Sequence, residues 1–218
     1  MKKISAVIFD MDGVICHTNP FHSLAFQSFF AKRQMFPTEE EFKAHMYGKS
    51  NRYIFSHFFQ REISDSELVE LEKEKEGLFR EIYAPHIETI PEFLPFLESI
   101  KSAGLKTGVA TSAPWANLDL IVSHLQIAPH MESMMASEHV THHKPHPEVY
   151  VTSADRLGVD PSACVVFEDS FSGVTAGLAA GMRVVGVLSS HSREELPPCH
   201  AYIENYSEIT VSDLQQLP

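Results

Sequence analysis

Four short apolar runs, in which polar residues do not alternate with apolar ones, constrain the fold of this 218-residue chain more than any other feature. The runs span residues 4–9, 107–110, 164–167 and 184–188. Strands of this kind are buried on both faces, as in a parallel sheet. Helical apolar stripes between the runs end at Gly104 and Gly158, where glycine commonly terminates a helix. Strands that alternate with helices predict an α/β fold with a doubly wound parallel sheet.

The segment from residue 18 to residue 84 breaks this alternation because it contains no convincing strand. Three residue pairs within it have the pattern of helix starts: Asn19 with Pro20, Thr38 with Glu41, and Ser64 with Glu67. We therefore predict an all-helical domain inserted after the first strand. The predicted domains are an α/β core at residues 1–16 and 86–218 and a helical domain at residues 17–85.

The charge balance narrows the choice of partners. The chain has 17 basic and 29 acidic residues, a formal net charge of −12 with neutral histidines. This charge repels nucleic-acid backbones and anionic membrane surfaces, so we expect neither as a partner. A small anionic substrate is compatible with it only where a metal ion or a local basic residue reverses the field.

Cysteine use and hydropathy predict the compartment. Cys16, Cys164 and Cys199 are far apart and in no metal-binding spacing, which favours a reducing environment over a disulfide framework. The first apolar run is closed by acidic residues, unlike the core of an export signal. The least charged stretch, at 170–192, is too weakly apolar to cross a bilayer. We expect a soluble, cytoplasmic protein.

A pair of carboxylates directly follows the first apolar run. Asp10 and Asp12 stand in the sequence Asp10-Met11-Asp12-Gly13-Val14, and the period-two geometry of an extended chain puts them on one side. The pair can serve as the acidic cap of a turn. It can also supply a nucleophile and a proton donor for reactions at phosphorus beside a divalent cation. The pair alone does not decide between these interpretations.

Further polar groups follow the later runs or lie between them. Thr111 and Ser112 follow the second run, Glu168 and Asp169 follow the third, and Lys144 lies between those two runs. Taken singly, each also has a structural interpretation, as a helix cap or a solvated surface residue. The carboxyl ends of consecutive strands in a doubly wound sheet face one crevice, however. Acids gathered there can bind a hard cation through oxygen.

The order and spacing of these groups resemble the haloacid dehalogenase superfamily over essentially the whole chain. Three segments look like the subfamily of β-phosphoglucomutase and related sugar-phosphate phosphatases: residues 10–15 (DMDGVI), 144–148 (KPHPE) and 168–174 (EDSFSGV). The resemblance implies a Rossmann-like α/β core in which the helical insertion is a cap over the site. A closed cap would exclude water, which competes with any other acceptor of a phosphoryl group.

The resemblance also implies roles for the motif residues. Asp10 would be the nucleophile that forms an aspartyl-phosphate, and Asp12 the general acid and then the general base. Thr111, the Ser112 amide and Lys144 would hold the transferring phosphoryl group. Lys144 adds a positive charge that the crevice otherwise lacks.

Mg²⁺ is the cofactor that the resemblance implies. It would bind the Asp10 carboxylate, the Asp12 backbone carbonyl and Asp169, with Glu168 close by. Such a cation would offset the repulsion among the acids and neutralise the phosphoryl oxygens, which otherwise would not approach so acidic a protein.

Substrate binding is assigned by the same resemblance to cap and hinge positions. These positions are Thr18, His22, Gly48, Lys49, Asn51, Arg52 and Lys75. The chain departs from the mutase pattern here, because that pattern has arginine directly after Gly-x-Ser, whereas Asn51 stands there and Arg52 comes one residue later. One residue turns a helical side chain by about 100°. The departure predicts that Arg52 misses the second phosphate that a mutase must hold.

Two other patterns are weaker. His139, His142, His143 and His146 are dense enough to suggest zinc. Adjacent histidines diverge in an extended loop, however, and no cysteine joins them, so we do not predict a zinc site.

Glycines that recur every four residues from 173 to 181 favour close packing of a helix on the sheet. No GxGxxG or P-loop follows any strand, which argues against nucleotide-binding folds of those types.

The function that these observations favour is a Mg²⁺-dependent phosphohydrolase of a small phosphorylated metabolite, in particular a sugar phosphate. A β-phosphoglucomutase and an inorganic pyrophosphatase share the chemistry and remain alternatives. A phosphoacceptor signalling domain is a rival from another class, although Asp12 and the helical insertion favour turnover. An inactive relative that only binds a metabolite is the remaining rival. We expect a monomer or a weak homodimer.

Overall fold

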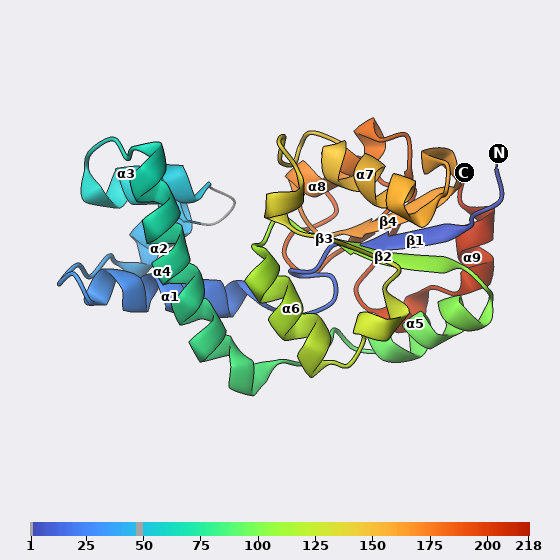
Figure 1. The fold of residues 1–218 in the computed structure, drawn as a ribbon, viewed down its shortest axis with the longest axis horizontal. Helices are drawn as coiled ribbons and strands as arrows, with labels where there is room; N and C mark the ends of the chain where they lie inside the picture. Colours follow the sequence, from blue (N-terminus) through green and yellow to red (C-terminus); the bar gives the residue numbers. More distant parts are fainter. Residues whose placement is uncertain (1, 47–49) are drawn as a thin grey trace. The chain divides into compact units, whose positions relative to one another are not determined.

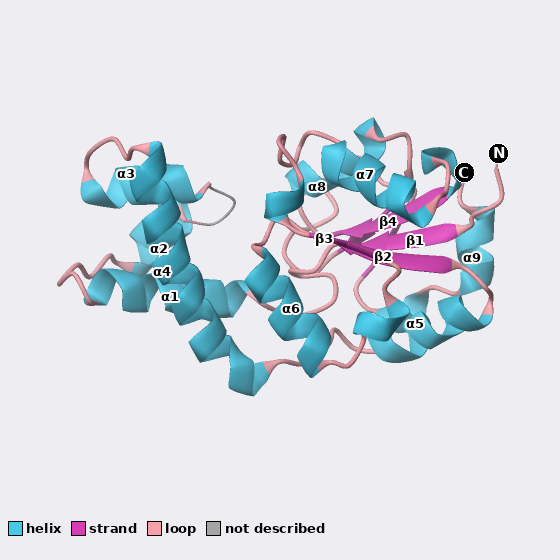
Figure 2. Cartoon of the chain, viewed as in Figure 1, coloured by secondary structure: helices cyan, strands magenta, loops and turns pink. Residues whose placement is uncertain are grey.

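The protein is described from a computed structural model, which covers residues 2–46 and 50–218. The chain divides into two compact units (Figure 1). One unit contains Met1–His17 and Ile87–Pro218 and the other contains Thr18–His86. Figure 2 shows that all strands belong to the first unit and that the second is helical. Each unit is considered by itself below.

The first unit is built on one six-stranded sheet. Its strands are β1 (Ala6–Phe9), β2 (Lys106–Ala110), β3 (Ser133–Met135), β4 (Cys164–Glu168), β5 (Arg183–Val187) and β6 (Ala201–Ile203). Their order is β3-β2-β1-β4-β5-β6, and every neighbouring pair is parallel. The predicted doubly wound parallel sheet is therefore confirmed. The sequence patterns missed β3 and β6, which are three-residue strands at the two sheet edges and have no apolar run of their own.

The strand order reverses at β1, which is paired with β2 on one side and β4 on the other. Phe9, the last residue of β1, is level with Val109 and with Phe167. The next residue, Asp10, follows at the carboxyl edge, where its backbone N–H donates to the Phe167 carbonyl at 3.0 Å. In doubly wound sheets this reversal point opens a crevice in which ligands bind. The sheet topology thus places the first acidic motif at the position where a ligand is expected.

Helices cover both faces of this sheet (Figure 1). They are α5 (Phe93–Ser102), α6 (Trp115–His124), α7 (Glu148–Leu157), α8 (Phe171–Ala179) and α9 (Val211–Gln216). Successive β1 residues point to opposite faces, as the strand geometry requires. Ile8 belongs to the core formed with α7 and α8, whereas the Phe9 ring contacts Phe93 of α5 and Tyr206.

The glycine patterns of this unit have two structural uses. Gly104 and Gly158, which follow α5 and α7, have φ values of +74° and +64°, a conformation that favours glycine. In α8, a Cβ atom at Gly177 would lie 2.9 Å from Val184 of β5. The predicted close packing of this helix on the sheet is confirmed at that position.

The second unit contains four α-helices among its described residues. They are α1 (Asn19–Ala31), α2 (Glu39–His45), α3 (Asn51–Phe59) and α4 (Asp65–Tyr83). Thr38 and Glu41 form the predicted capping box of α2, and the Ser64 side chain caps α4 by accepting a hydrogen bond from the Glu67 backbone N–H. The first helix begins one residue earlier than predicted, because Thr18 rather than Asn19 is its N-cap residue.

Phenylalanine side chains form the core of this helical unit. Phe29 and Phe30 of α1 and Phe55 of α3 are fully buried, and the Phe29 and Phe55 rings have centroids 5.1 Å apart.

Among residues 2–46 and 50–218, no helix is both long and apolar enough to cross a membrane.

Replacing Phe93 by alanine tests the packing beneath β1. The Phe93 ring is fully buried between Phe9 and Tyr206, with ring centroids 5.2 and 5.3 Å away. We expect Phe93→Ala to lower the free energy of unfolding by about 3–5 kcal/mol, because it leaves a cavity that the sheet cannot close. Urea unfolding followed by circular dichroism measures this loss.

Phe36→Ala is the matched control, because 78% of the Phe36 side chain is exposed. We expect this change to alter the free energy of unfolding by less than about 0.5 kcal/mol. Equal losses in the two variants would contradict the packing described here.

Candidate active site

A tight turn after β1 holds the two aspartates of the first motif. The Met11 carbonyl accepts hydrogen bonds from the backbone N–H groups of Ile15 and Cys16, and Gly13 N–H donates to the Cys16 carbonyl. Gly13 has a φ of +74°, and a Cβ atom there would lie 2.0 Å from Asp169 Oδ2. Glycine is therefore needed for both the backbone conformation and the close approach of Asp169.

Lys144 lies at the centre of the site. Its Nζ donates to Asp10 Oδ1 at 2.6 Å, to Glu168 Oε1 at 2.7 Å and to the Ala110 carbonyl at 3.1 Å. The lysine side chain is 4% exposed. Burial alone would lower the pKa of Lys144, but the two carboxylates hold this pKa above its ordinary value. Lys144 is therefore a permanent positive charge in contact with the first acidic motif.

Glu168 orients Lys144 and is itself fixed from several directions. Its Oε1 accepts hydrogen bonds from Lys144 and from the Tyr150 hydroxyl, each at 2.7 Å. Its Oε2 accepts from the backbone N–H groups of Asp169 and Ser170 and from the Ser170 hydroxyl, all at 3.0 Å. Burial alone would raise the pKa of Glu168, but Lys144 and these hydrogen bonds hold it below its ordinary value. Glu168 is thus an anion whose two oxygens already have five protein donors.

Two residues around Glu168 were not anticipated from the sequence. Tyr150 is fully buried in the first turn of α7, with its hydroxyl directed at Glu168. Gly173 lies at the start of α8, and a Cβ atom there would come within 1.7 Å of Glu168 Oε1. The helical stripe of α7 marks position 150 as buried, but no pattern indicates where its hydroxyl points. The four-residue glycine spacing indicates close packing, but not that a carboxylate would occupy the space.

Asp10, Glu168 and Asp169 form a buried group of carboxylates with one ligand atom from each lying within 4.8 Å of the others. Burial raises the pKa of Asp10 well above its usual range, although Lys144 acts in the opposite direction. Burial and then the neighbouring Glu168 raise the pKa of Asp169 to about 8. The Lys144 ammonium contacts two of these carboxylates, those of Asp10 and Glu168. Clustered carboxylate oxygens with an excess of negative charge are the environment that a hard divalent cation such as Mg²⁺ requires, so these residues fit that ion.

The hydroxyl motif after β2 lies beside the second aspartate. Thr111 is buried, and its Oγ1 donates to Asp12 Oδ2 at 3.5 Å while it accepts from the Ala113 backbone N–H at 3.0 Å. Ser112 follows at the same sheet edge with an exposed side chain. The structure thus brings Asp10, Asp12 and Thr111 together with Lys144 and the acids that end β4.

The predicted substrate-binding residues of the cap belong to the helical unit. Lys75 Nζ lies 2.8 Å from His22 Nδ1 and 2.7 Å from Glu76 Oε1. The Lys75 ammonium also faces the Phe26 ring, 4.7 Å from its centroid, and the His22 ring stacks on Phe79. Lys75 is buried within this unit, and so is the neighbouring Glu76. Gly48 and Lys49 lie outside the described residues.

The remaining cap residues make contacts within their own unit. Asn51 donates to Glu72 Oε1 at 3.1 Å. The Arg52 guanidinium donates to the Ile63 carbonyl at 2.6 Å and to Asp65 Oδ1 at 2.5 Å. Thr18, the N-cap residue of α1, accepts hydrogen bonds from helical N–H groups at its backbone carbonyl. Arg52 is thus held by groups of the helical unit in this structure.

Comparisons with known proteins identify the family and the fold of the chain. A family model described as haloacid dehalogenase-like hydrolase matches residues 7–187. The chain is 30% identical to fructose-1-phosphate phosphatase YqaB of Escherichia coli K12 over 85% of its length and 97% of the relative. A haloacid dehalogenase hydrolase structure from Entamoeba histolytica has a TM-score of 0.92, with 26% identity over 98% of this chain and 99% of that one. A β-phosphoglucomutase structure from Clostridium difficile has a TM-score of 0.83, with 25% identity over 98% and 96%.

Replacing Tyr150 by phenylalanine tests the network around Glu168. The variant removes only the hydroxyl that donates to the buried Glu168 carboxylate. We expect a loss of about 1.5–3 kcal/mol in the free energy of unfolding, because the acceptor is charged. Tyr206→Phe is the control, since the buried Tyr206 hydroxyl donates to the neutral Val14 carbonyl at 3.0 Å, and it should cost about 0.5–1.5 kcal/mol. A loss at Tyr150 no larger than at Tyr206 would contradict the arrangement.

Asp169→Asn tests the raised pKa of the Asp169 carboxyl group in metal-free protein. Asp169 binds its proton up to pH about 8 in the folded state but loses it near pH 4 when unfolded, so folding takes up a proton in this window. Stability conferred by the proton is therefore lost as the pH rises from about 4 to 8. We expect Asp169→Asn to raise the thermal midpoint at pH 8 by roughly 2–4 °C, with no gain below pH 4.

Thermal unfolding across this pH range, with Asp155→Asn as an exposed control, makes the measurement. Added Mg²⁺ should raise the midpoint of the wild-type protein and leave that of Asp169→Asn nearly unchanged. A midpoint of Asp169→Asn below that of the wild type at pH 8 without metal would show that the ionised carboxylate stabilises the fold.

Proposed function

The chain belongs to the haloacid dehalogenase-like hydrolases, and on that premise we propose that it is a Mg²⁺-dependent phosphatase of a small sugar phosphate. The phosphoryl group would be carried transiently on Asp10. One observation supports this more than any other: the buried Asp10 carboxylate, at the reversal point of the sheet, lies 2.6 Å from the buried Lys144 ammonium. A carboxylate, a fixed cation and a neighbouring second aspartate are the groups that phosphoryl transfer through a covalent intermediate needs.

Asp10 acts as the nucleophile in the first step. Its carboxylate oxygen forms a bond to phosphorus while the bond between phosphorus and the sugar oxygen breaks. Burial removes water from this carboxylate, and Lys144 holds Oδ1 in place. Once Asp10 carries the phosphoryl group, the same ammonium can pair with a phosphoryl oxygen, because its second partner, Glu168, keeps it at the site.

Asp12 moves the protons of both steps. It gives a proton to the departing sugar oxygen, and it later accepts a proton from the water molecule that attacks the aspartyl-phosphate. That attack releases inorganic phosphate and regenerates the Asp10 carboxylate. Thr111, whose hydroxyl is within 3.5 Å of Asp12 Oδ2, and the Ser112 backbone amide would orient phosphoryl oxygens at the end of β2.

The cation has a site that these residues can form. The Asp10 carboxylate, the Asp12 backbone carbonyl and Asp169 would hold Mg²⁺, which when bound supplies charge neutralisation for the phosphoryl oxygens. Glu168 lies beside them, but its two oxygens are held by five protein donors. We assign Glu168 chiefly to the positioning of Lys144.

A sugar phosphate is the substrate class that the relatives and the cap favour. The relative from Escherichia coli is named for fructose 1-phosphate. In the helical unit, His22 and Lys75 form a polar pair among aromatic rings, which suits hydroxyl groups on an apolar-faced ring. These cap residues would therefore read the sugar, whereas the sheet unit performs the chemistry on the phosphate.

The hydrogen bonds that Arg52 makes within the helical unit favour hydrolysis over the mutase reaction. A phosphosugar mutase must hold the second phosphate of a bisphosphorylated intermediate, and the structural relative from Clostridium difficile keeps that function as the alternative. Here the Arg52 guanidinium already pairs with Asp65 and the Ile63 carbonyl, and Asn51 pairs with Glu72. Recruiting Arg52 to a phosphate would require breaking two hydrogen bonds.

Phosphate release across a panel of sugar phosphates, nucleotides and pyrophosphate tests the proposal. We expect Mg²⁺-dependent release from one or a few sugar phosphates, and we expect Asp10→Asn to reduce kcat by more than about a thousandfold, because an amide cannot act as the nucleophile. Asp155→Asn, an exposed aspartate on α7, should retain wild-type rates.

Substantial Mg²⁺-dependent release by Asp10→Asn would contradict the mechanism. Formation of glucose 6-phosphate from β-glucose 1-phosphate faster than phosphate release would identify the mutase instead. Preferred hydrolysis of pyrophosphate would overturn the substrate class while leaving the mechanism intact.

A further inference from the structure

The loop that delivers Lys144 to the buried site also carries two histidines on the protein surface. Lys144 is directed inward to Asp10 and Glu168. His142 and His146, two residues away on either side, have side chains that are 63% and 52% exposed. Glu148, the first residue of α7, lies against both of them. The three side chains form one of two groups of potential metal ligands among the residues that the structure describes.

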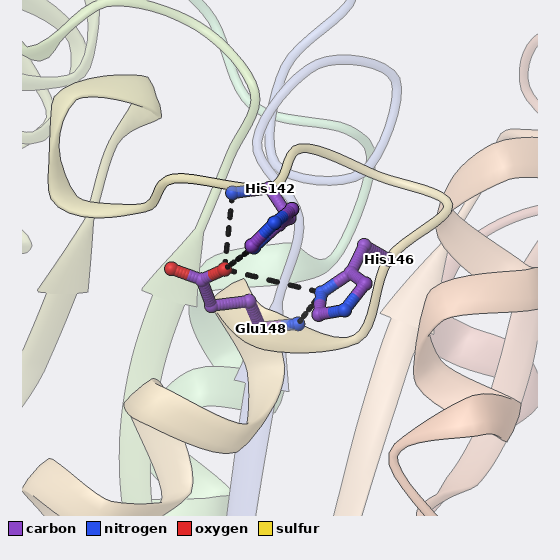
Figure 3. Close-up of side chains that lie close together, drawn as sticks. All are labelled: His142, His146 and Glu148. Atoms are coloured by element: carbon purple, nitrogen blue, oxygen red, sulfur yellow. Dashed lines mark hydrogen bonds and ion pairs between the residues drawn. The ribbon is translucent and has the colours of Figure 1, made fainter.

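Figure 3 shows that His142 and His146 both lie against the Glu148 carboxylate. His142 Nδ1 lies 2.7 Å from Glu148 Oε2, and His146 Nδ1 lies 3.9 Å from the same oxygen. The two imidazole rings have centroids 4.6 Å apart. Ligands on a tetrahedral Zn²⁺ ion lie about 3.3 Å apart, given bond lengths near 2.05 Å. The observed separations bracket that value, so small side-chain rotations would bring all three donors onto one ion.

Much of this donor set is already ordered without an ion. Glu148 Oε1 accepts from the Thr141 backbone N–H at 2.8 Å, and Oε2 accepts from the His142 backbone N–H at 3.0 Å. These contacts fix the carboxylate and, with the His142 side chain, lower the pKa of Glu148 to about 2, so it is anionic over the physiological range. The Glu148 backbone N–H donates to His146 Nδ1 at 3.3 Å, so an ion bound at that nitrogen would displace this contact. The Glu148 carboxylate, in contrast, is already held in place by backbone donors.

The chemistry of the donors selects the class of ion. Two imidazole nitrogens and one carboxylate suit Zn²⁺ and neighbouring divalent transition metals, whereas Mg²⁺ prefers oxygen alone. The open side of the exposed cluster leaves room for water as the remaining ligand. This set is separate from the buried carboxylates that fit Mg²⁺.

We propose that His142, His146 and Glu148 form a surface site for a divalent transition-metal ion of the Zn²⁺ class, which fastens the loop that carries Lys144 to the start of α7. The ion replaces the proton between His142 Nδ1 and Glu148, which is released to solvent, and it takes the place of the Glu148 backbone N–H at His146 Nδ1. It thereby joins both histidines to the same carboxylate. The sequence analysis predicted no zinc site in this histidine-rich segment, because the adjacent His142 and His143 would diverge. That interpretation overlooked the pairing of His142 with His146 across the Lys144 turn, and His143 does not belong to the group that these two form with Glu148.

Zn²⁺ binding by the untagged full chain tests this site without substrate, so its outcome does not depend on the proposed phosphatase activity. Mg²⁺ is kept in excess to occupy the buried acids, and a chromophoric chelator competes for Zn²⁺. We expect the wild type to retain one Zn²⁺ per chain with micromolar or tighter affinity. His142→Ala, His146→Ala and Glu148→Gln should each weaken this binding at least tenfold, because each removes one ligand.

His143→Ala is the matched control, since it removes an exposed histidine from the same loop and should leave the affinity unchanged. Circular dichroism verifies that each variant is folded. Visible absorption of bound Co²⁺ gives a second readout, because histidine ligation changes its spectrum and loss of His146 should reverse that change. Equal Zn²⁺ affinity in the wild type and all three ligand variants, or no stoichiometric binding by the wild type, would overturn the proposal.

Discussion

The contact between Lys144 and the buried carboxylates is the interaction on which the rest of the site depends. Asp10, Glu168 and Asp169 are buried together, and a single ammonium group lies among them. Removing charges from water is costly unless they are paired and hydrogen-bonded. Glu168 satisfies that requirement with five donors, whereas Asp10 and Asp169 have raised pKa values. The excess of carboxylates over ammonium groups makes this cluster suitable for a divalent cation.

The fold serves this arrangement by bringing distant segments to one edge. The reversal of strand order at β1 places Asp10 between the ends of β2 and β4, and the turn before α7 brings in Lys144 from the far part of the chain. Two glycines make room for the acids, since side chains at Gly13 and Gly173 would overlap Asp169 and Glu168.

The sequence predicted the sheet and its acidic edge because uninterrupted apolar runs followed by acids are a local signal. Short edge strands such as β3 have no such signal. The role of Lys144 came from family resemblance, since a lone lysine has no pattern that reveals burial. The Tyr150 hydroxyl and the pairing of His142 with His146 depend on how a turn directs side chains. Spacing along the chain does not encode that direction, so only the structure could reveal these contacts.

The most direct test of the central claim is to trap the covalent intermediate. Acid quenching during turnover of a labelled sugar phosphate, followed by peptide mapping, would locate the label. The account predicts a transient label on the peptide that contains Asp10, absent in Asp10→Asn and unaffected in Asp155→Asn. Turnover without any labelled protein, or a label on a peptide that lacks Asp10, would contradict it.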